Sequence, residues 1–337
     1  MKKNTYLTAL ALTLCVAVSA QTTIEPAPTT TGLFSVSGNT QVYFATGNLQ
    51  HVISTDKWYI AEHQYDILGT DNVKGGTITH DEDYGDATEG TALADTIDLY
   101  GWSSNNAKAP YGVSTSTLDA DYNGDYVNWG NTIQDGHNWR VLSQTEWEYL
   151  ISGRTNADNL QGAARINLND AGTQYVNGVI LLPDTWTCPD GVTFKAGYAK
   201  DYLIRSYADH QTFTLSQWQL LEDEGAVFLP TGGMRNGTSI EDVLSSGYYR
   251  TSTISSVTNN ATSYKVSAQS ITLDYSTNSS GYSVRLVRDK GTTPTAIIPT
   301  TTTTATPTAH THKVLYHNQL LLIHNNTTYT PLGQQVK

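Results

Sequence analysis

Short runs in which apolar and polar residues alternate recur over much of the 337-residue chain, with turn residues between them. The runs 34–36 (Phe-Ser-Val) and 41–44 (Gln-Val-Tyr-Phe) flank Ser-Gly-Asn at 37–39, which is the pattern of a β-hairpin. Trp-Tyr-Ile-Ala at 58–61 indicates another short strand. This alternation predicts that strands dominate the fold.

Helical spacing occurs at two places, and both begin with the same start signal. Ser143 stands three residues before Glu146, and Thr214 stands three residues before Gln217. In such a capping box the hydroxyl accepts from the third helical amide, and the third helical side chain reaches back to the N-cap amide. The predicted apolar faces are Trp147, Leu150 and Ile151 in the first helix and Leu215, Trp218 and Leu221 in the second.

Each predicted helix is followed by an apolar run that ends at proline, at 178–183 and again at 225–230. We interpret the two copies as two related layers rather than a tandem repeat array. The run 282–287 alternates and is expected to close the domain. Further short strands are expected at 165–168, 248–253, 263–266 and 270–273. Few helices, many short strands and irregular connections predict one α+β domain over residues 33–289.

Two stretches, 69–98 and 103–138, lack this periodicity and are rich in Gly, Asp, Asn and Thr. We expect both to be long surface loops, which in compact domains usually serve a function or are disordered. The second stretch, with Trp102 before it, also carries aromatic residues. Aromatic faces in loops can stack on sugar rings, or they can anchor irregular loops to the core. Both interpretations apply to Trp102, Tyr111, Tyr122, Tyr126 and Trp129.

The first 20 residues have the pattern of a secretory signal peptide. Lys2 and Lys3 precede an apolar run, and Val18-Ser19-Ala20 predicts cleavage after Ala20. A lipoprotein anchored at Cys15 is the alternative. Residues 21–32 form a polar leader, and no other run is long enough to predict a transmembrane span. These features predict a secreted or outer cell-surface protein.

The formal net charge is −12 and the isoelectric point is near 5.0. An acidic chain without a basic cluster lacks the footprint that phosphate backbones require, so a nucleic-acid partner is excluded. Cleavage of the signal peptide would leave Cys188 as the single cysteine, without a disulfide partner. We expect it to be a buried thiol, because no cationic residue flanks it; a reactive thiol is the alternative.

The segment 139–149 (Trp-Arg-Val-Leu-Ser-Gln-Thr-Glu-Trp-Glu-Tyr) resembles the R-L-P-T-E-A-E-W-E-Y signature of the formylglycine-generating enzyme (sulfatase-modifying factor) superfamily. Gly-Gly-Met-Arg at 232–235 stands where that family has Arg-Gly-Gly-Ser. Gly-Tyr-Ser-Val-Arg at 281–285 resembles the family's closing Gly-Phe-Arg. The resemblance covers about 33–289 and implies a C-type-lectin-like fold. The pattern is most similar to uncharacterised paralogous secreted proteins of gut Bacteroidetes.

The chain departs from the enzymes of this superfamily at the residues that carry their chemistry. The enzymes bind copper through a cysteine pair late in the domain, whereas residues 232–288 contain no cysteine. The Gly-Asn-Val-Trp-Glu-Trp segment is also missing, as is the helical domain in which ergothioneine-type relatives bind iron through three histidines. The resemblance therefore implies the fold and not the oxygen chemistry, and we expect no enzymatic activity and no catalytic residues.

Residues 290–312 form a Thr/Pro-rich linker, which cannot bury a core. Beyond it, residues 313–337 are expected to form a small β-meander. Its end, Tyr-Thr-Pro-Leu-Gly-Gln-Gln-Val-Lys, resembles the end of a Bacteroidetes C-terminal sorting domain for type IX secretion. The resemblance implies contact with an export machinery; a simple β-appendage is the alternative.

One loop has oxygen donors at alternate positions, like a calcium loop. Asp119, Asp121, Asn123 and Asp125 are followed at the twelfth position by Gly130 in place of the usual glutamate. The same residues are typical of a solvated turn. Calcium is the only cofactor that the sequence indicates.

In C-type-lectin-like folds the ligand-facing region corresponds to about 235–262 in this chain. Its Tyr, Asn, Ser and Arg residues have the composition of a binding surface, although the two tyrosines at 248 and 249 can equally be strand residues with alternating burial. The candidate ligand-binding residues are Arg235, Asn236, Tyr248, Tyr249, Arg250 and Trp129.

These observations predict a secreted or cell-surface protein that recognises a glycan or protein ligand without catalysis. Two alternatives stay open: a structural surface component such as an adhesin or fimbrial accessory, and a divergent enzyme of the formylglycine-generating class.

Overall fold

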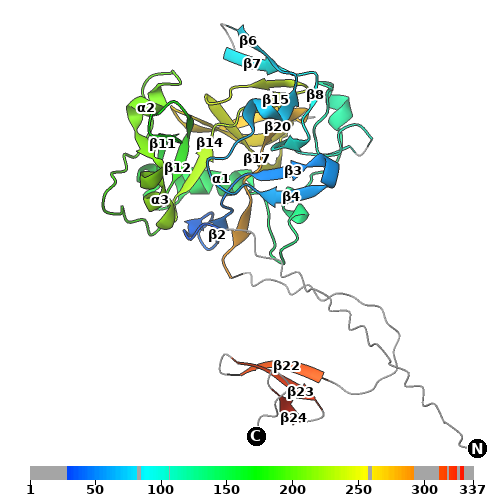
Figure 1. The fold of residues 1–337 in the computed structure, drawn as a ribbon, viewed down its shortest axis with the longest axis vertical. Helices are drawn as coiled ribbons and strands as arrows, with labels where there is room; N and C mark the ends of the chain where they lie inside the picture. Colours follow the sequence, from blue (N-terminus) through cyan, green and yellow to red (C-terminus); the bar gives the residue numbers. More distant parts are fainter. Residues whose placement is uncertain are drawn as a thin grey trace, which may run out of the picture. The chain divides into compact units, whose positions relative to one another are not determined.

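The computed structural model describes residues 29–81, 85–105, 107–256 and 260–291, and the backbone of 311–316, 319–324 and 327–329 (Figure 1). At 78–81 and 85 only the backbone is described. The chain divides into two compact units, Met1–Thr295 and Ala296–Lys337. The predicted signal peptide, most of the leader and most of the linker lie outside the described residues.

The first unit is an α+β structure dominated by strands, as the alternating pattern predicts (Figure 1). The predicted hairpin is confirmed, since β1 (Phe34–Ser35) pairs antiparallel with β2 (Gln41–Phe44). The last strand of the unit, β21 (Val287–Asp289), pairs with the other side of β2. This three-stranded sheet therefore joins the two ends of the domain.

A nine-stranded sheet forms the centre of the unit (Figure 1). Its order is β19-β18-β17-β20-β15-β16-β7-β6, with β10 beside β20. The strands are β6 (Thr77–Asp81), β7 (Gly85–Glu89), β10 (Leu99–Tyr100), β15 (Met234–Asn236), β16 (Ser239–Glu241), β17 (Ser246–Ile254), β18 (Asn260–Ser267), β19 (Ile271–Thr277) and β20 (Ser280–Ser283). The three predicted strands between 248 and 273 are confirmed as parts of β17, β18 and β19.

A four-stranded sheet has the order β13-β11-β12-β14. It consists of β11 (Gln161–Asn167), β12 (Tyr175–Leu181), β13 (Thr212–Thr214) and β14 (Val227–Pro230). The two proline-terminated runs lie in β12 and β14, which pair antiparallel with Gly178 opposite Pro230. The interpretation as two layers is therefore wrong. The two strands are both apolar because they are neighbours in one sheet that is buried on both faces.

Three α-helices pack around these sheets: α1 (Gln144–Glu148), α2 (Ser206–His210) and α3 (Leu215–Asp223). Both predicted capping boxes are present. Trp147, Trp218 and Leu221 are buried, whereas Leu215 is 38% exposed. The prediction for Leu215 is wrong because helical side chains lean toward the N-terminus, so the first residue of α3 projects past the helix end.

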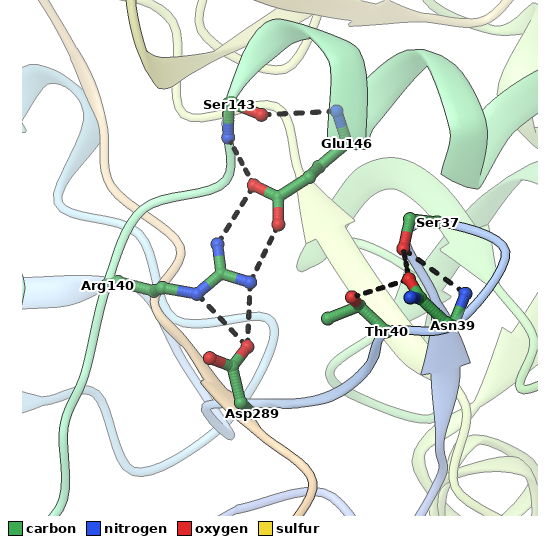
Figure 2. Close-up of polar contacts among 7 residues, drawn as sticks. All are labelled: Ser37, Asn39, Thr40, Arg140, Ser143, Glu146 and Asp289. Carbon is green, nitrogen blue, oxygen red and sulfur yellow. Dashed lines mark hydrogen bonds and ion pairs between the residues drawn. The ribbon is translucent and has the colours of Figure 1, made fainter.

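Helix α1 continues into the π-helical turn η5 (Tyr149–Gly153), and a charged cluster holds its start (Figure 2). Nη1 and Nη2 of Arg140 each donate a hydrogen bond to one carboxylate oxygen of Glu146, at 2.9 and 2.7 Å. Its Nη2 also donates to Asp289 of β21 at 2.7 Å, and the amide of Ser143 donates to Glu146 at 2.8 Å. Glu146 therefore closes the capping box and links α1 to the domain's last strand.

The expectation of a loop at 69–98 is wrong, because this stretch contains short strands. The β6–β7 hairpin pairs with β16 at the edge of the central sheet. The strands were not visible in the sequence because backbone pairing to β16, rather than an apolar face, holds them. The stretch 69–98 also contains β5 (Val73–Lys74), β8 (Ala92–Leu93) and β9 (Thr96–Ile97). Two further short strands precede it, β3 (Leu49–Val52) and β4 (Lys57–Ile60).

The described part of 103–138 contains no strand and only the 3-10 turns η3 (Asp119–Tyr122) and η4 (Trp129–Thr132), as expected for a loop. The remaining turns of the unit are η1 (Ile53–Thr55), η2 (Gly69–Asn72) and η6 (Ala157–Asn159). The apolar and polar residues at 282–287 were expected to alternate between buried and exposed positions, and this expectation is wrong. All six residues are buried, because the chain passes there from the central sheet at β20 to the terminal sheet at β21.

The second unit is a three-stranded antiparallel meander of β22 (Thr311–Tyr316), β23 (Gln319–His324) and β24 (Thr327–Tyr329). A meander was predicted for 313–337, and its first strand begins two residues earlier, at Thr311. The sorting-type residues 330–337 lie outside the described residues. In the described parts of the chain, no helix has the length and apolar character needed to cross a membrane.

We predict that Ser143→Ala lowers the free energy of unfolding by about 1 kcal/mol, because the amide of Glu146 loses its cap. Chemical denaturation followed by circular dichroism measures the change. Ser152→Ala is the control: it removes a hydroxyl that donates to the Glu148 carbonyl within the same helical segment, with an expected change within about 0.5 kcal/mol. Equal losses in the two variants would contradict a specific role of the cap.

Candidate functional site

A groove of about 670 Å³ opens on the described surface, and its volume is within the range of roughly 300–1,000 Å³ for small-ligand sites. We call it the Tyr202 groove. Its lining residues are Asp86, Tyr202, Leu203, Ile204, Tyr207, Met234, Glu241, Asp242, Val243, Ser245, Ser246, Tyr248, Lys265, Ser267, Ala268 and Gln269. They come from β7, the start of α2, the β15–β16 hairpin, β17 and the end of β18.

One wall of the groove is the segment that leads into α2. The amide of Ala199 donates to the carbonyl of Ala268 at 2.8 Å, beside the turn after β18. The hydroxyl of Tyr207 donates to the carbonyl of Ser245 at 2.8 Å, across the groove. These two bonds hold the wall to both β18 and the turn before β17.

Three consecutive apolar side chains of this wall face solvent. Tyr202 is 76% exposed, Leu203 is 49% exposed and Ile204 is 43% exposed. Single exposed apolar residues are ordinary, but a contiguous patch beside a hollow is typical of a binding surface. The patch is the clearest sign that the groove receives a ligand.

The opposite side of the groove has a polar network around Tyr248. Its hydroxyl donates to Asp242 at 2.5 Å, and its ring stacks on Tyr282 with centroids 4.8 Å apart. The ammonium of Lys265 lies 5.2 Å from the Tyr248 ring centre and 3.8 Å from Asp242. Burial, and then the Asp242 carboxylate, raise the pKa of Tyr248, so this phenol stays protonated and donates its hydrogen bond to Asp242.

The turn between β16 and β17 has an unusual backbone conformation. Asp242 and Leu244 have φ values of 61° and 63°, in the left-handed region. Asp tolerates this region, but a leucine there is strained. Hydrogen bonds enforce the turn: the Leu244 amide donates to Thr231 at 2.9 Å, and the Ser246 amide donates to Asp242 at 2.8 Å. The turn is thereby held in the one conformation that presents Asp242 to the groove.

The lining has an excess of negative charge. Among the described residues, it contains the carboxylates of Asp86, Glu241 and Asp242 and one ammonium, that of Lys265. Burial raises the pKa of Glu241, and the nearby carboxylates of Asp242 and Glu89 raise it further, against the bond from Ser239 that lowers it. Glu241 is therefore a carboxylate whose surroundings disfavour its charge.

Most of the residues that were predicted from the sequence to bind a ligand are buried. Their assignment to a ligand-binding surface is therefore wrong. Arg235 and Tyr249 are 0% exposed, Arg250 is 2% exposed and Trp129 is 4% exposed. Tyr248 is the only predicted residue that lines the groove, and Asn236 is exposed at the β15–β16 turn outside it. Burial does not alternate along the first half of β17, because this central strand is covered on both faces.

The buried candidates form hydrogen bonds inside the domain instead. The hydroxyl of Tyr249 donates to the carbonyl of Pro230 at 2.8 Å, and Nε of Arg250 donates to that of Tyr100 at 3.2 Å. The indole of Trp129 donates to the carbonyl of Gly101 at 2.9 Å. Nη2 of Arg235 donates to Asn72 at 3.3 Å. These side chains hold strands and loops in place.

The aromatic residues of the loop 103–138, with Trp102 before it, anchor the loop to the core, which is one of the two interpretations of the sequence. Trp102, Tyr122 and Trp129 are buried, while Tyr111 and Tyr126 are half-buried. The rings of Trp129 and Trp58 stack with centroids 5.8 Å apart, and those of Trp102 and Tyr126 lie 5.3 Å apart. These rings fix the loop 103–138 to the body of the domain.

The calcium-like loop has its carboxylates engaged with protein groups. Asp119 accepts from the hydroxyl of Ser279 at 2.9 Å, and Asp121 is paired with the ammonium of Lys108. Asn123 and Asp125 are exposed. In the described parts of the chain, no three His, Cys, Asp or Glu side chains are grouped so that they could hold a metal ion. Calcium binding here stays a prediction, and Lys108 occupies the Asp121 carboxylate that it would need.

The prediction that Cys188 is buried is wrong. The residue is exposed, and its thiol donates to the carbonyl of Val192 at 3.5 Å. It lies in an irregular connection between β12 and α2, where no pattern of apolar positions could indicate burial.

Apart from Tyr248, the residues that form the groove were not predicted from the sequence. The run Tyr202-Leu203-Ile204 carried one signal, because three apolar residues follow one another without a strand or helix period. Glu241, Asp242 and Lys265 carried no signal. They are far apart in the chain and become neighbours only through strand pairing.

We predict that Trp129→Ala lowers the free energy of unfolding by about 3–5 kcal/mol, because a buried indole leaves a cavity. Tyr202→Ala, at an exposed site, should change it by less than about 0.5 kcal/mol. Urea unfolding of both variants followed by fluorescence measures the difference. A stable Trp129→Ala variant would contradict the anchoring role.

The calcium loop is tested by thermal melts in millimolar calcium and in chelator. With Lys108 on Asp121, we expect the same melting midpoint in both conditions. A midpoint that rises with calcium in the natural protein, and not in Asp121→Asn, would establish the site, because a ligand that binds only the folded state stabilises it.

Comparison of the chain with family models, with curated proteins and with solved structures finds no match. The candidate site is therefore argued from the geometry and chemistry of its own residues.

Proposed function

We propose that the chain is a secreted or cell-surface recognition protein, with a C-type-lectin-like domain, that binds a glycan or protein ligand without catalysis in the Tyr202 groove. The observation that carries the proposal is the exposed run of Tyr202, Leu203 and Ile204 beside a polar hollow. Secretion rests on the signal-peptide pattern at 1–20 and on the sorting-type tail.

The composition of the groove supports binding rather than reaction. The described residues of its lining include no histidine and no cysteine, and the hydroxyl of Tyr248 is committed to Asp242. Binding sites combine an apolar face with a few fixed polar groups that orient the ligand. The Tyr202 wall supplies the face, and the network of Tyr248, Asp242 and Lys265 supplies fixed polar groups.

One observation favours the structural alternative. Strand β19 is at the edge of the central sheet, and within the described strands it pairs only with β18. Tyr275 on this strand is 57% exposed. An exposed edge strand can pair with another chain, so β19 is the place at which copies of this protein would join into a surface polymer.

The proposed function is tested by screening the full chain against glycan arrays and immobilised peptides, and then by comparing two tyrosine variants. We expect Tyr202→Ala to weaken binding at least about tenfold, which is about 1.4 kcal/mol, without unfolding the protein. Tyr275→Ala is the matched control: it removes an exposed tyrosine outside the groove, and it should bind as the natural protein does.

Absence of any bound ligand, or equal binding by natural protein and Tyr202→Ala, would contradict the groove as the site. Assembly of the natural protein into polymers that Tyr275→Ala abolishes, without ligand binding, would favour the structural alternative.

A further inference from the structure

The backbone of the groove is unsuited to an extended peptide. Strands that accept a peptide do so with an unpaired edge. Of the strands that line the groove, β16 pairs with β15 and β7, β17 pairs with β18 and β20, and β18 pairs with β17 and β19. The lining strands β7 and β15 are likewise paired on both sides, so the described strands of the groove offer a ligand no edge strand. The groove must therefore bind through side chains, as protein sites do for sugars.

The shape of the wall suits a sugar ring. Tyr202 offers an exposed ring face, with the aliphatic side chains of Leu203 and Ile204 beside it. The C–H face of a pyranose packs on such a surface, while its hydroxyls bond to groups across the groove. Serines, Gln269 and two half-buried carboxylates, Glu241 and Asp242, lie in the lining.

The charge of the lining selects among sugars. Among the described lining residues, the half-buried carboxylates of Glu241 and Asp242 share one ammonium, that of Lys265, which lies 3.8 Å from Asp242 and also contacts the Tyr248 ring. A uronic or sulfated sugar would bring an anion next to Glu241 and Asp242, which costs free energy by like-charge repulsion. A protonated amine would relieve the repulsion instead.

The surroundings of Glu241 agree with a bound cation. Its carboxylate is half-buried, accepts a bond from the Ser239 hydroxyl at 3.2 Å and lies near Asp242 and Glu89, which raise its pKa together with burial. A cation bound beside it would replace the lost solvation and stabilise the charged form.

We infer that the Tyr202 groove binds a glycan with unacetylated amino sugars, whose ring packs on Tyr202 and whose protonated amines lie at Glu241 and Asp242. This inference rests on the proposed function, since it names the ligand of the same groove. Lys265 then competes with the ligand amine for Asp242 and limits the affinity.

The test uses two probes of equal length that differ only in the amine: oligomers of glucosamine and oligomers of N-acetylglucosamine. Titration calorimetry with the full chain at neutral pH and low salt measures both. We expect the glucosamine oligomer to bind at least about tenfold more tightly, and its binding to weaken as salt rises, because the added interactions are between charges.

Three variants identify the groups. Glu241→Gln should weaken binding of the glucosamine oligomer about tenfold and leave the acetylated oligomer unchanged. Glu224→Gln is the matched control, an exposed carboxylate outside the groove, and it should have no effect. Lys265→Met should tighten binding of the glucosamine oligomer, because Asp242 loses its competing cation; thermal melts verify that each variant is folded.

The outcomes separate this inference from the proposed function. Equal binding of the two oligomers, or weaker binding of the glucosamine oligomer in Lys265→Met, overturns the inference about charge. So does a ligand other than an amino sugar, such as a lysine-rich peptide or an acidic glycan, whose binding is lost in Tyr202→Ala; the groove then keeps its proposed function. Absence of binding to any glycan or peptide removes both.

Discussion

The guanidinium of Arg285 is the interaction on which the arrangement of the sheets depends. The side chain is 1% exposed, and it donates to Asn48 at 3.0 Å, to the carbonyl of Ala45 at 3.1 Å and to the carbonyl of Phe228 at 2.8 Å. Ala45 follows β2, Asn48 precedes β3 and Phe228 lies in β14, so one side chain joins three sheets. Burial lowers its pKa, yet it stays charged, and leaving these buried acceptors unpaired would be costly.

The position of the groove follows from this junction. Strand β14 ends at Pro230, whose carbonyl accepts from the Tyr249 hydroxyl of β17, and the next residue, Thr231, accepts from the Leu244 amide. The strained turn that presents Asp242 is therefore attached to the strand that Arg285 holds. The wall with Tyr202 is bonded to the same turn through Tyr207 of α2, and to the turn after β18 through Ala199. A rigid polar side and an exposed apolar side thus face each other, as a recognition site requires.

The successful sequence predictions concern features with short-range causes. The two capping boxes, the 34–44 hairpin and the strands at 248–273 depend on residues a few positions apart, and all are present. The failures concern burial and neighbours. Arg235 and Tyr249 belong to a segment whose composition is typical of a binding surface. Both side chains are nevertheless buried, and both lie on interior strands of the central sheet. Of the groove, only Tyr248 and the apolar run at 202–204 could have been found, because the carboxylates and Lys265 meet through long-range pairing.

By itself, the sequence determined the types of its most regular elements, the starts of α1 and α3, the α+β class and the acidic character of the surface, because these depend on local residue spacing and on composition. Only the tertiary structure decided which side chains reach solvent. Strands with one face covered and strands with both faces covered can carry the same Tyr-Arg-Ser pattern, and what packs on the two faces of the sheet sets the exposure of their side chains. The groove is accordingly a product of strand order: β16, β17 and β18 place Glu241, Tyr248 and Lys265 together opposite Tyr202.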